Sequence, residues 1–216
     1  QQGGIVPMVE PEVLMDGAHT IDRCMEATEW ALKETFQQLY YAGVKLEGII
    51  LKPNMVISGK KCATQASREE VAEKTLKILK RCVPAAVPGI AFLSGGQSSE
   101  DATAHLHHMN AAGPLPWKLT FSYGRALQAD ALKAWGGKKE NVAAGQRAFA
   151  HRAQMNALAA AGRWTAATPA DLQAAAQVTP QTIYDNYQVP SAGSHGSKLG
   201  SQAVVEFGYT ANFNEA

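Results

Sequence analysis

The sequence predicts a parallel α/β fold, and three observations lead to that prediction. Short apolar segments rich in Val, Ile, Leu or Phe recur along the 216 residues, as expected of strands that are buried on both faces. A helical segment follows each of them, which is the order of a parallel sheet with helical crossovers. Glu10, Lys52 and Ser94 lie 42 positions apart, and in a parallel α/β barrel chemistry is assembled at the ends of such strands.

The apolar segments predict strands at about 5–10, 47–52, 90–94 and 118–123. The first helix is expected at about 20–42, where residues from Ile21 to Leu39 recur at helical spacing and give the helix one packing face. The second helix begins at the capping box Ser67-Arg-Glu-Glu70 and ends before Pro84, because proline cannot continue a helix.

The later helices also begin or end at recognisable capping and glycine residues. A third helix is expected to start around 98–101, and a fourth spans Arg125 to Trp135 and ends at Gly136-Gly137. A long Ala-rich helix follows from about 139 to 161 and ends at Gly162. Glycine terminates helices because it adopts the left-handed conformation at no steric cost.

The character of the sequence changes at about residue 166. Residues 168–171 resemble a helix start with proline in its first position, and 190–200 have the composition of a flexible loop or tail. We therefore assign 1–165 to one domain and 166–216 to a helical, then flexible, C-terminal tail. Four β/α units are half of an eight-unit barrel, and an open four-stranded sheet would leave its edges uncovered.

The composition excludes several classes of function. With 46% hydrophobic residues, 18% charged residues and a net charge of +1, the chain gives no reason to expect nucleic acid or a membrane surface as a partner. Its three cysteines show no C-x-x-C spacing, so we expect neither disulfides nor a zinc site, and a reducing compartment. Gln1-Gln-Gly-Gly leads directly into a strand, which indicates that the chain begins within a longer one.

Lys52 is the first candidate for chemistry. Because side chains alternate along a strand, Gly48, Ile50 and Lys52 share one face. Apolar neighbours would partly desolvate the amine and favour its neutral, nucleophilic form. The alternative is a strand-end lysine whose amine extends into water.

Glu10 and Glu12 form the second candidate. They are two positions apart in the first strand, so both carboxylates would face the same side. Like charges this close favour protonation of one member, which then donates a proton while the other stays ionised. The alternative is a pair of solvated glutamates, although Pro11 between them indicates a shaped turn.

The third candidate is a phosphate site at the loop Ser94, Gly95 and Gly96, between a strand and a helix. Glycines let backbone N–H groups approach an anion closely, and a helix N-terminus adds a favourable dipole. The alternative is ordinary loop structure, because glycine pairs are common in loops.

The next strand ends with Ser122, Gly124 and Arg125, which strengthens the phosphate hypothesis. Arginine binds phosphate oxygens bidentately, and loops after the last two strands of a barrel commonly hold phosphate. A cation at a helix N-terminus opposes the helix dipole, so an anion beside Arg125 is expected. The alternative is a solvated residue in the first helical turn.

The histidines and tryptophans are weaker candidates. His105, His107 and His108 lie on one helix without a carboxylate at ligand spacing, which favours an exposed helix face over a metal site. The tryptophans are expected to be packing residues: Trp30, Trp117, Trp135 and Trp164.

Five blocks of sequence together closely resemble class I fructose-bisphosphate aldolase, in unbroken order over about residues 1–165. The blocks are Ile5-Val-Pro-Met-Val-Glu-Pro-Glu-Val, Leu46-Glu-Gly-Ile-Ile-Leu-Lys-Pro-Asn-Met-Val, Phe92-Leu-Ser-Gly-Gly-Gln-Ser, Leu119-Thr-Phe-Ser-Tyr-Gly-Arg-Ala-Leu-Gln and Lys133-Ala-Trp-Gly-Gly-Lys-Lys-Glu-Asn. The resemblance implies a (β/α)8 TIM barrel, of which this chain covers about the last four β/α units plus a C-terminal tail.

The resemblance also implies a reaction, the reversible cleavage of fructose 1,6-bisphosphate to dihydroxyacetone phosphate and glyceraldehyde 3-phosphate in glycolysis and gluconeogenesis. Lys52 matches the Schiff-base lysine, Glu10 the acid/base glutamate and Glu12 its neighbouring carboxylate. The substrate phosphate would be bound at the matching positions Ser94, Gly95, Gly96, Ser122, Gly124 and Arg125. No metal or cofactor is implied, because the iminium is the electron sink.

Two departures from the family leave an alternative open. The first half of the barrel, with the family's aspartate and further lysines, lies outside this sequence, so the chain is expected to be an incomplete active site. The end Phe213-Asn-Glu-Ala216 lacks the C-terminal tyrosine of many members. The alternative is a truncated, non-catalytic product that binds sugar phosphates and acts through assembly. The family implies a homo-oligomer, usually a tetramer, in the cytoplasm or the plastid.

Overall fold

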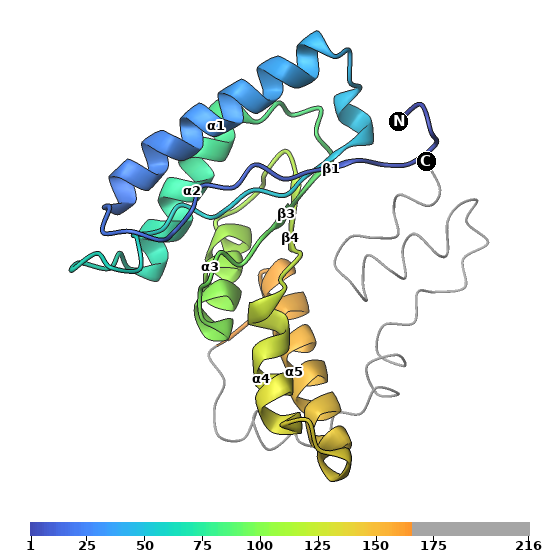
Figure 1. Cartoon of the computed structure of the whole chain (residues 1–216). Helices are drawn as coiled ribbons and strands as arrows, with labels where there is room; N and C mark the ends of the chain where they lie inside the picture. The colour runs from blue at the N-terminus through green and yellow to red at the C-terminus, as the bar shows by residue number, and fades with distance from the viewer. Residues whose placement is uncertain (166–216) are drawn as a thin grey trace.

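The structure is a computed structural model of the chain and describes residues 1–165. Its centre is a parallel sheet of four strands that follow one another in chain order (Figure 1). The strands are β1 (Met8–Val9), β2 (Ile50–Leu51), β3 (Gly89–Phe92) and β4 (Lys118–Phe121). The predicted parallel α/β fold is confirmed, and the expected tail at 166–216 lies outside the described residues.

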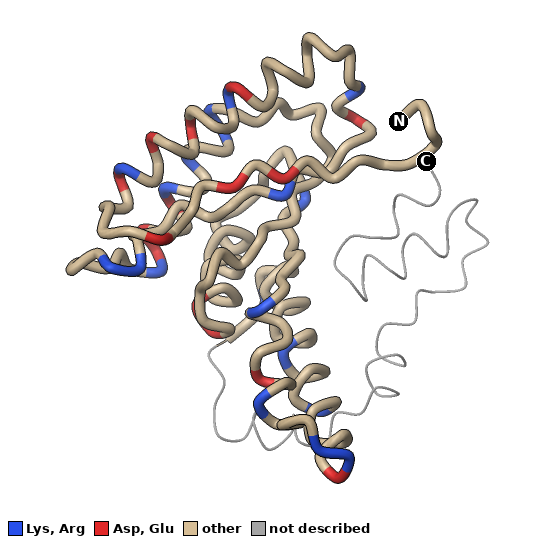
Figure 2. The backbone as a smooth tube through the Cα atoms, viewed as in Figure 1, with Lys and Arg blue, Asp and Glu red and all other residues tan. Residues whose placement is uncertain are grey.

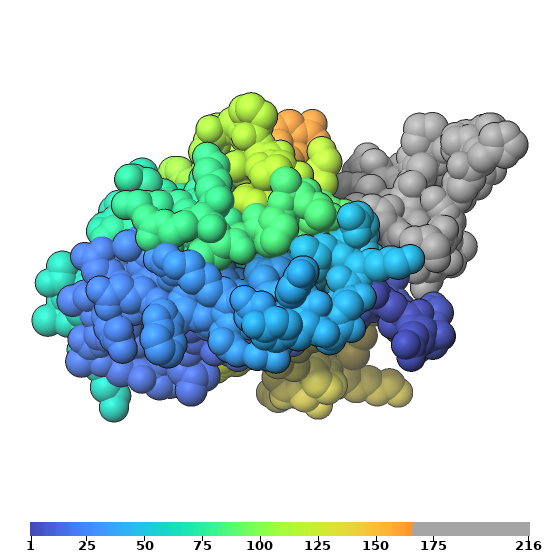
Figure 3. Space-filling view, turned by 90° about the horizontal axis from the view of Figure 1, so that it is seen from above, coloured from blue at the N-terminus to red at the C-terminus, as the bar shows by residue number. Residues whose placement is uncertain are grey.

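Helices connect the strands and pack beside one another. They are α1 (Ile21–Tyr41), α2 (Arg68–Cys82), α3 (Ser99–Ala111), α4 (Arg125–Trp135) and α5 (Val142–Ala160), with short 3-10 turns at Leu46–Gly48 and Lys139–Asn141. Helix α1 contacts α2, α2 contacts α3, and α5 contacts both α3 and α4. Seen from above, α1 in blue and α2 in green form adjacent parts of one surface (Figure 3). The result is a continuous layer of helices along the sheet.

The helix boundaries follow the capping signals in the sequence. The hydroxyl of Ser67 accepts a hydrogen bond from the N–H of Glu70 at 3.2 Å, and Ser98 caps α3 in the same way. Gly136 ends α4 with a φ of 58°, a left-handed conformation that suits glycine. The strands are shorter than predicted, because regular pairing of β1 and β2 covers two residues in each.

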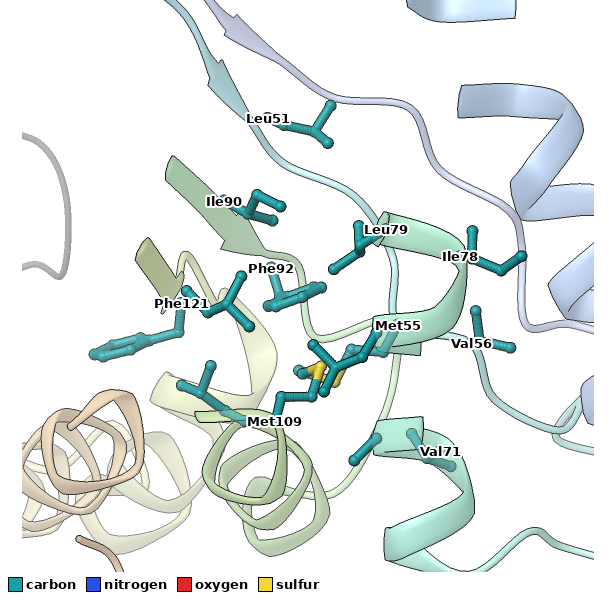
Figure 4. Packing of buried hydrophobic residues seen from close by; sticks show 14 of the residues in the cluster. Leu51, Met55, Val56, Val71, Ile78, Leu79, Ile90, Phe92, Met109 and Phe121 are labelled. Atoms are coloured by element: carbon teal, nitrogen blue, oxygen red, sulfur yellow. The ribbon is translucent and has the colours of Figure 1, made fainter. Parts of the chain in front are cut away.

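Most of the core lies between the sheet and the helices. Side chains from three strands, among them Leu51, Phe92 and Phe121, converge with Leu79 of α2 and Met109 of α3 (Figure 4). These side chains are close to fully buried, so the burial of apolar surface fixes the helices on this face of the sheet.

The two faces of the sheet have different neighbours. Ile49 and Leu51 belong to the core beneath the helices, whereas Ile50 packs with Ala91 and Val6 in a separate cluster. This confirms the predicted alternation, in which Lys52 follows on the same face as Ile50. The side chain of Lys52 therefore lies on the face of the sheet away from the helices.

The tryptophans correct part of the sequence prediction. Trp117 is buried and donates a hydrogen bond to the carbonyl oxygen of Pro84 at 3.0 Å, as a packing residue should. Trp30 is 83% exposed and Trp135 is 41% exposed, so the prediction was wrong for these two. Trp30 lies on the opposite side of α1 from the buried Thr28 and Leu32, because two residues along a helix turn the side chain by more than half a circle.

Charge is distributed without a dominant sign. Both α1 and α2 carry Lys or Arg as well as Asp or Glu positions (Figure 2), in keeping with the net charge of +1. Among the described residues, no helix is both long enough and apolar enough to cross a membrane.

The fold predicts which leucines stabilise the chain. Leu51→Ala removes a fully buried side chain and should lower the free energy of unfolding by about 2–5 kcal/mol. The matched control is Leu132→Ala on α4, where the leucine is mostly exposed and a change within about 0.5 kcal/mol is expected. Urea denaturation followed by circular dichroism gives both values. Similar losses in the two variants would contradict the described core.

Candidate active site

Lys52 and Glu10 meet at the carboxyl ends of the first two strands. Nζ of Lys52 lies 3.0 Å from Oε1 of Glu10, and the two side chains are 19% and 47% exposed. The register pairs Met8 with Ile50 and Val9 with Leu51, so the next step along the ladder brings Glu10 opposite Lys52. The N–H of Lys52 continues the ladder with a 2.7 Å hydrogen bond to the carbonyl oxygen of Val9.

Asn54 holds the backbone around this pair, and its role was missed in the sequence. Its side-chain oxygen accepts a hydrogen bond from the N–H of Val13 at 3.0 Å, and its side-chain nitrogen donates to Thr28 of α1 at 3.0 Å. Asn54 is buried, so losing these partners would be costly. In the sequence, the one sign of this role is that Asn54 is a single polar residue between Pro53 and the apolar residues that follow.

Glu12 is close in sequence but does not join the pair. Both Glu10 and Glu12 are exposed, with the half-buried Pro11 between them, and regular pairing of the strand ends at Val9. Within residues 1–165, Glu12 forms no ion pair. Glu10 is thus the carboxylate that faces the amine, and a role for Glu12 stays a prediction.

The loop after β3 forms a tight turn. The N–H of Gln97 donates to the carbonyl oxygen of Ser94 at 3.0 Å, and Gly95 and Gly96 have φ values of 53° and 69°. Two consecutive left-handed residues define a type I′ turn, which strongly favours glycine. The side chain of Ser94 is buried, so packing fixes the residue at which the turn begins.

A buried histidine supports this turn from α3. The amide nitrogen of Gln97 donates to the carbonyl oxygen of Ser94 at 2.8 Å, and Nδ1 of His105 lies 2.6 Å from the amide oxygen of Gln97. An amide oxygen only accepts, so Nδ1 of His105 carries the proton. Burial lowers the pKa of His105 from 6.5 to about 4, which keeps the ring neutral at physiological pH.

The same residue corrects the prediction of an exposed histidine face. His105 is buried, while His107 and His108 are half-buried. Position 105 faces the core because α3 also buries Leu106 and Met109 against the sheet. The helix is buried on a wider face than its polar sequence indicated.

Arg125 approaches the turn from the loop after β4. Ser122 continues the ladder by donating its N–H to the carbonyl oxygen of Phe92 at 2.8 Å, and Gly124 precedes the first residue of α4, Arg125. A methyl group placed on Gly96 would lie 3.8 Å from Nη2 of Arg125. The structure thus brings the arginine to the glycine turn, as the phosphate hypothesis requires.

The 42-residue spacing is only partly a structural repeat. It matches the register between β1 and β2, but β2 pairs with β3 through Ile50 and Gly89. By that register the partner of Lys52 is Ala91, and Ser94 lies three residues further along. The glycine turn therefore lies further along the strand direction than the lysine.

Fold and site together define a partial parallel α/β barrel with a lysine–glutamate pair at its carboxyl edge. The family model for fructose-bisphosphate aldolase class-I matches residues 1–184, and the chain belongs to this family.

Individual relatives agree with the family match. The chain is 56% identical over 165 residues to a probable fructose-bisphosphate aldolase class 1 of Xanthomonas axonopodis pv. citri, covering 76% of this chain and 49% of that protein. It is 53% identical over 175 residues to fructose-bisphosphate aldolase B of Gallus gallus, covering 81% and 48%. The chain spans about half the length of the curated relatives it matches.

A solved structure also resembles the described fold. Fructose-bisphosphate aldolase of Plasmodium falciparum, crystallised with TRAP and a small-molecule inhibitor, superposes with a TM-score of 0.73 at 49% identity. The match covers 75% of this chain and 47% of that one. The four β/α units are therefore part of an aldolase TIM barrel.

The burial of His105 predicts a pH dependence of stability. Between pH 6.5 and about 4 the unfolded chain binds a proton at this histidine that the folded chain does not. The free energy of unfolding is therefore expected to fall as the pH is lowered through this window, by about 3 kcal/mol from His105 alone. His105→Gln replaces the imidazole with an amide that can still donate a hydrogen bond but does not titrate, so its loss of stability on acidification should be smaller.

Urea midpoints at about pH 7 and about pH 4.5, measured for both proteins, give the comparison. Parallel pH profiles for the wild-type chain and the variant would contradict a neutral, buried His105.

Proposed function

We propose that this chain carries the Schiff-base centre of a class I fructose-bisphosphate aldolase, acting in the cleavage of fructose 1,6-bisphosphate and in the reverse condensation. The observation that supports this most strongly is the 3.0 Å separation between Nζ of Lys52 and Oε1 of Glu10. A nucleophilic amine needs a group that manages protons within hydrogen-bond reach.

In the proposed mechanism, the neutral amine of Lys52 attacks the ketone carbon of the substrate. Glu10 moves a proton from the nitrogen to the alkoxide oxygen, which gives the neutral carbinolamine. After taking a second proton from solvent, Glu10 donates it to the hydroxyl of the carbinolamine, which leaves as water. Glu10, again a carboxylate, removes the proton of the hydroxyl group on the far carbon of the adjacent carbon–carbon bond. That hydroxyl becomes the carbonyl of the aldehyde, and the electron pair of the breaking bond moves into the resulting iminium. The products are an aldehyde and an enamine on Lys52, and protonation and hydrolysis of the enamine release dihydroxyacetone phosphate and restore the amine.

The remaining residues are proposed to hold the substrate phosphate. The N–H groups of the Gly95–Gly96 turn and the guanidinium of Arg125 supply donors, and Ser94, Ser122 and Gly124 shape the two loops. Phosphate binding fixes the distance from the phosphate to the reacting carbon, and such positioning supplies a large part of enzymatic rate enhancement. Glu12 is proposed as an additional carboxylate beside Glu10.

A second candidate function rests on the edges of the described sheet. Strands β1 and β4 form these edges, and such edges can pair with another chain, so we also propose a phosphate-ester binding unit that acts without turnover and associates through its sheet edges. For either function we infer a cytoplasmic or plastid location and a homo-oligomer, by analogy with the family.

The Schiff base predicts a covalent adduct. Incubation of the 216-residue chain with dihydroxyacetone phosphate and sodium borohydride should reduce the imine and attach the ligand to Lys52, as mapped by peptide mass spectrometry. Lys52→Met should abolish the adduct. Lys118→Met is the matched control, because Lys118 is an exposed lysine at the opposite end of a strand, and its adduct yield should equal that of the wild-type chain.

An adduct that persists in Lys52→Met would contradict the assigned nucleophile. Binding of the phosphate ester without any adduct in the wild-type chain would favour the second candidate function.

The proposed acid/base role of Glu10 predicts slower formation of the adduct rather than its loss. Glu10→Gln keeps the side chain's shape but removes its proton transfer, so the rate of adduct formation should fall by about 100-fold or more. Glu12→Gln is the control, and a smaller effect is expected because Glu12 does not contact Lys52. Rapid quenching with borohydride at a series of times gives both rates. Equal rates for Glu10→Gln and the wild-type chain would contradict the acid/base role.

A further inference from the structure

Lys60, in the loop between β2 and α2, lies against the glycine turn. A methyl group placed on Gly96 would lie only 2.5 Å from Nζ of Lys60 and 3.8 Å from Nη2 of Arg125. The ammonium and the guanidinium therefore reach the same face of Gly96 from two different loops. The space beside this glycine is occupied by cations.

Backbone hydrogen bonds hold Lys60 at this position. Its N–H donates to the carbonyl oxygen of Met15 at 2.9 Å, and the N–H groups on either side of it, at Gly59 and Lys61, donate to His19 and Gly17. These bonds join the loop after β2 to the loop after β1. The arrangement is close, since a methyl group on Gly59 would lie 2.5 Å from the carbonyl oxygen of Gly17.

The Met15 side chain completes the arrangement around the turn. Its terminal carbon lies 3.2 Å from the position of a methyl group on Gly95, and the side chain is buried. Met15 thus packs on one glycine of the turn while Lys60, bonded to it through the backbone, reaches the other. Three loops fix the position of the ammonium relative to the turn.

The charges around Lys60 are unbalanced. Its carboxylate neighbour is Asp16, whose Oδ1 lies 3.6 Å from Nζ, beyond normal hydrogen-bond length. Among the hydrogen bonds of residues 1–165, none uses Nζ of Lys60 or the guanidinium of Arg125. Two cations with free donors at one glycine turn repel each other unless an anion lies between them.

We propose that Lys60 is a further phosphate-binding residue, which clamps the phosphate monoester of the substrate together with Arg125 over the Gly95–Gly96 turn. The proposal rests on the proposed role of this turn in phosphate binding. Lys60 donates to a phosphate oxygen on one side, Arg125 donates on the other, and the N–H groups of the turn lie beneath.

Asp16 has a defined part in this proposal. Without a phosphate, its carboxylate holds the ammonium of Lys60 in place. A phosphate dianion displaces Asp16 because it carries more charge and more acceptor oxygens. Asp16 therefore competes with the ligand and weakens its binding.

The test measures phosphate binding directly. Isothermal titration of the 216-residue chain at low salt uses inorganic phosphate, dihydroxyacetone phosphate and unphosphorylated dihydroxyacetone as three probes. Lys60→Met should weaken binding of the two phosphorylated probes by about fivefold to tenfold, the range for a charge-assisted hydrogen bond at a half-exposed site. Lys61→Met is the matched control, one residue along the same loop, and should change binding by less than about twofold.

Asp16→Asn gives an independent test in the opposite direction. It removes the competing carboxylate and should tighten phosphate binding by about twofold to threefold. Equal effects of Lys60→Met and Lys61→Met, no tightening in Asp16→Asn, or no binding of inorganic phosphate by the wild-type chain would each overturn the proposal.

The outcome is separable from that of the proposed reaction. Inorganic phosphate has no carbonyl group and forms no Schiff base, so its binding does not depend on Lys52. A chain that binds phosphate through Lys60 but gives no borohydride adduct would support the clamp and contradict the reaction, and the reverse result would contradict the clamp alone.

Discussion

The register of the parallel sheet is the constraint on which the rest of this structure depends. Pairing of Met8 with Ile50 brings Glu10 to the amine of Lys52 at 3.0 Å. A slip of one residue would turn every side chain of a strand to the opposite face. Lys52 would then point toward the helices, where a charged group without a partner is costly. The buried faces on both sides of β2 therefore fix the register and, with it, the position of the Lys52 amine.

Close backbone contacts also fix the loops that follow the strands. The loops after β1 and β2 are joined by hydrogen bonds at Gly59, Lys60 and Lys61, and the turn at Gly95 and Gly96 packs against side chains from both loops. Glycine is required at Gly96 for two reasons, its φ of 69° and the lack of space for a methyl group. The partly buried Gln97–His105 contact holds the turn from the other side. These three loops are thus fixed by packing and hydrogen bonds.

Sequence reasoning reached the fold because each signal was local and strong. Apolar strands, the caps at Ser67 and Ser98 and the glycine at 136 each act within a few residues, and all agree with the structure. The pairing of Glu10 with Lys52 also followed from spacing, because their separation of 42 residues equals the offset between paired residues of β1 and β2. The difference of three residues at Ser94 depends on loop length, which periodicity does not report.

The contacts that sequence reasoning missed depend on the fold as a whole. Asn54 connects the segment after β2 to the loop after β1 and to helix α1, both distant in sequence, and His105 is buried because α3 packs on the sheet. The approach of Lys60 to Gly96 results from bonds between two loops. Nothing in the residues around Lys60 distinguishes it from Lys61, so only the three-dimensional arrangement identifies it.

A crystal structure of the chain with dihydroxyacetone phosphate tests the central claim most directly. Continuous density is expected from Nζ of Lys52 to the former ketone carbon, with Glu10 beside it. Phosphate oxygens are also expected within hydrogen-bond distance of the Gly95–Gly96 turn, Arg125 and Lys60. A ligand bound elsewhere, with Lys52 unmodified and still paired with Glu10, would contradict that claim.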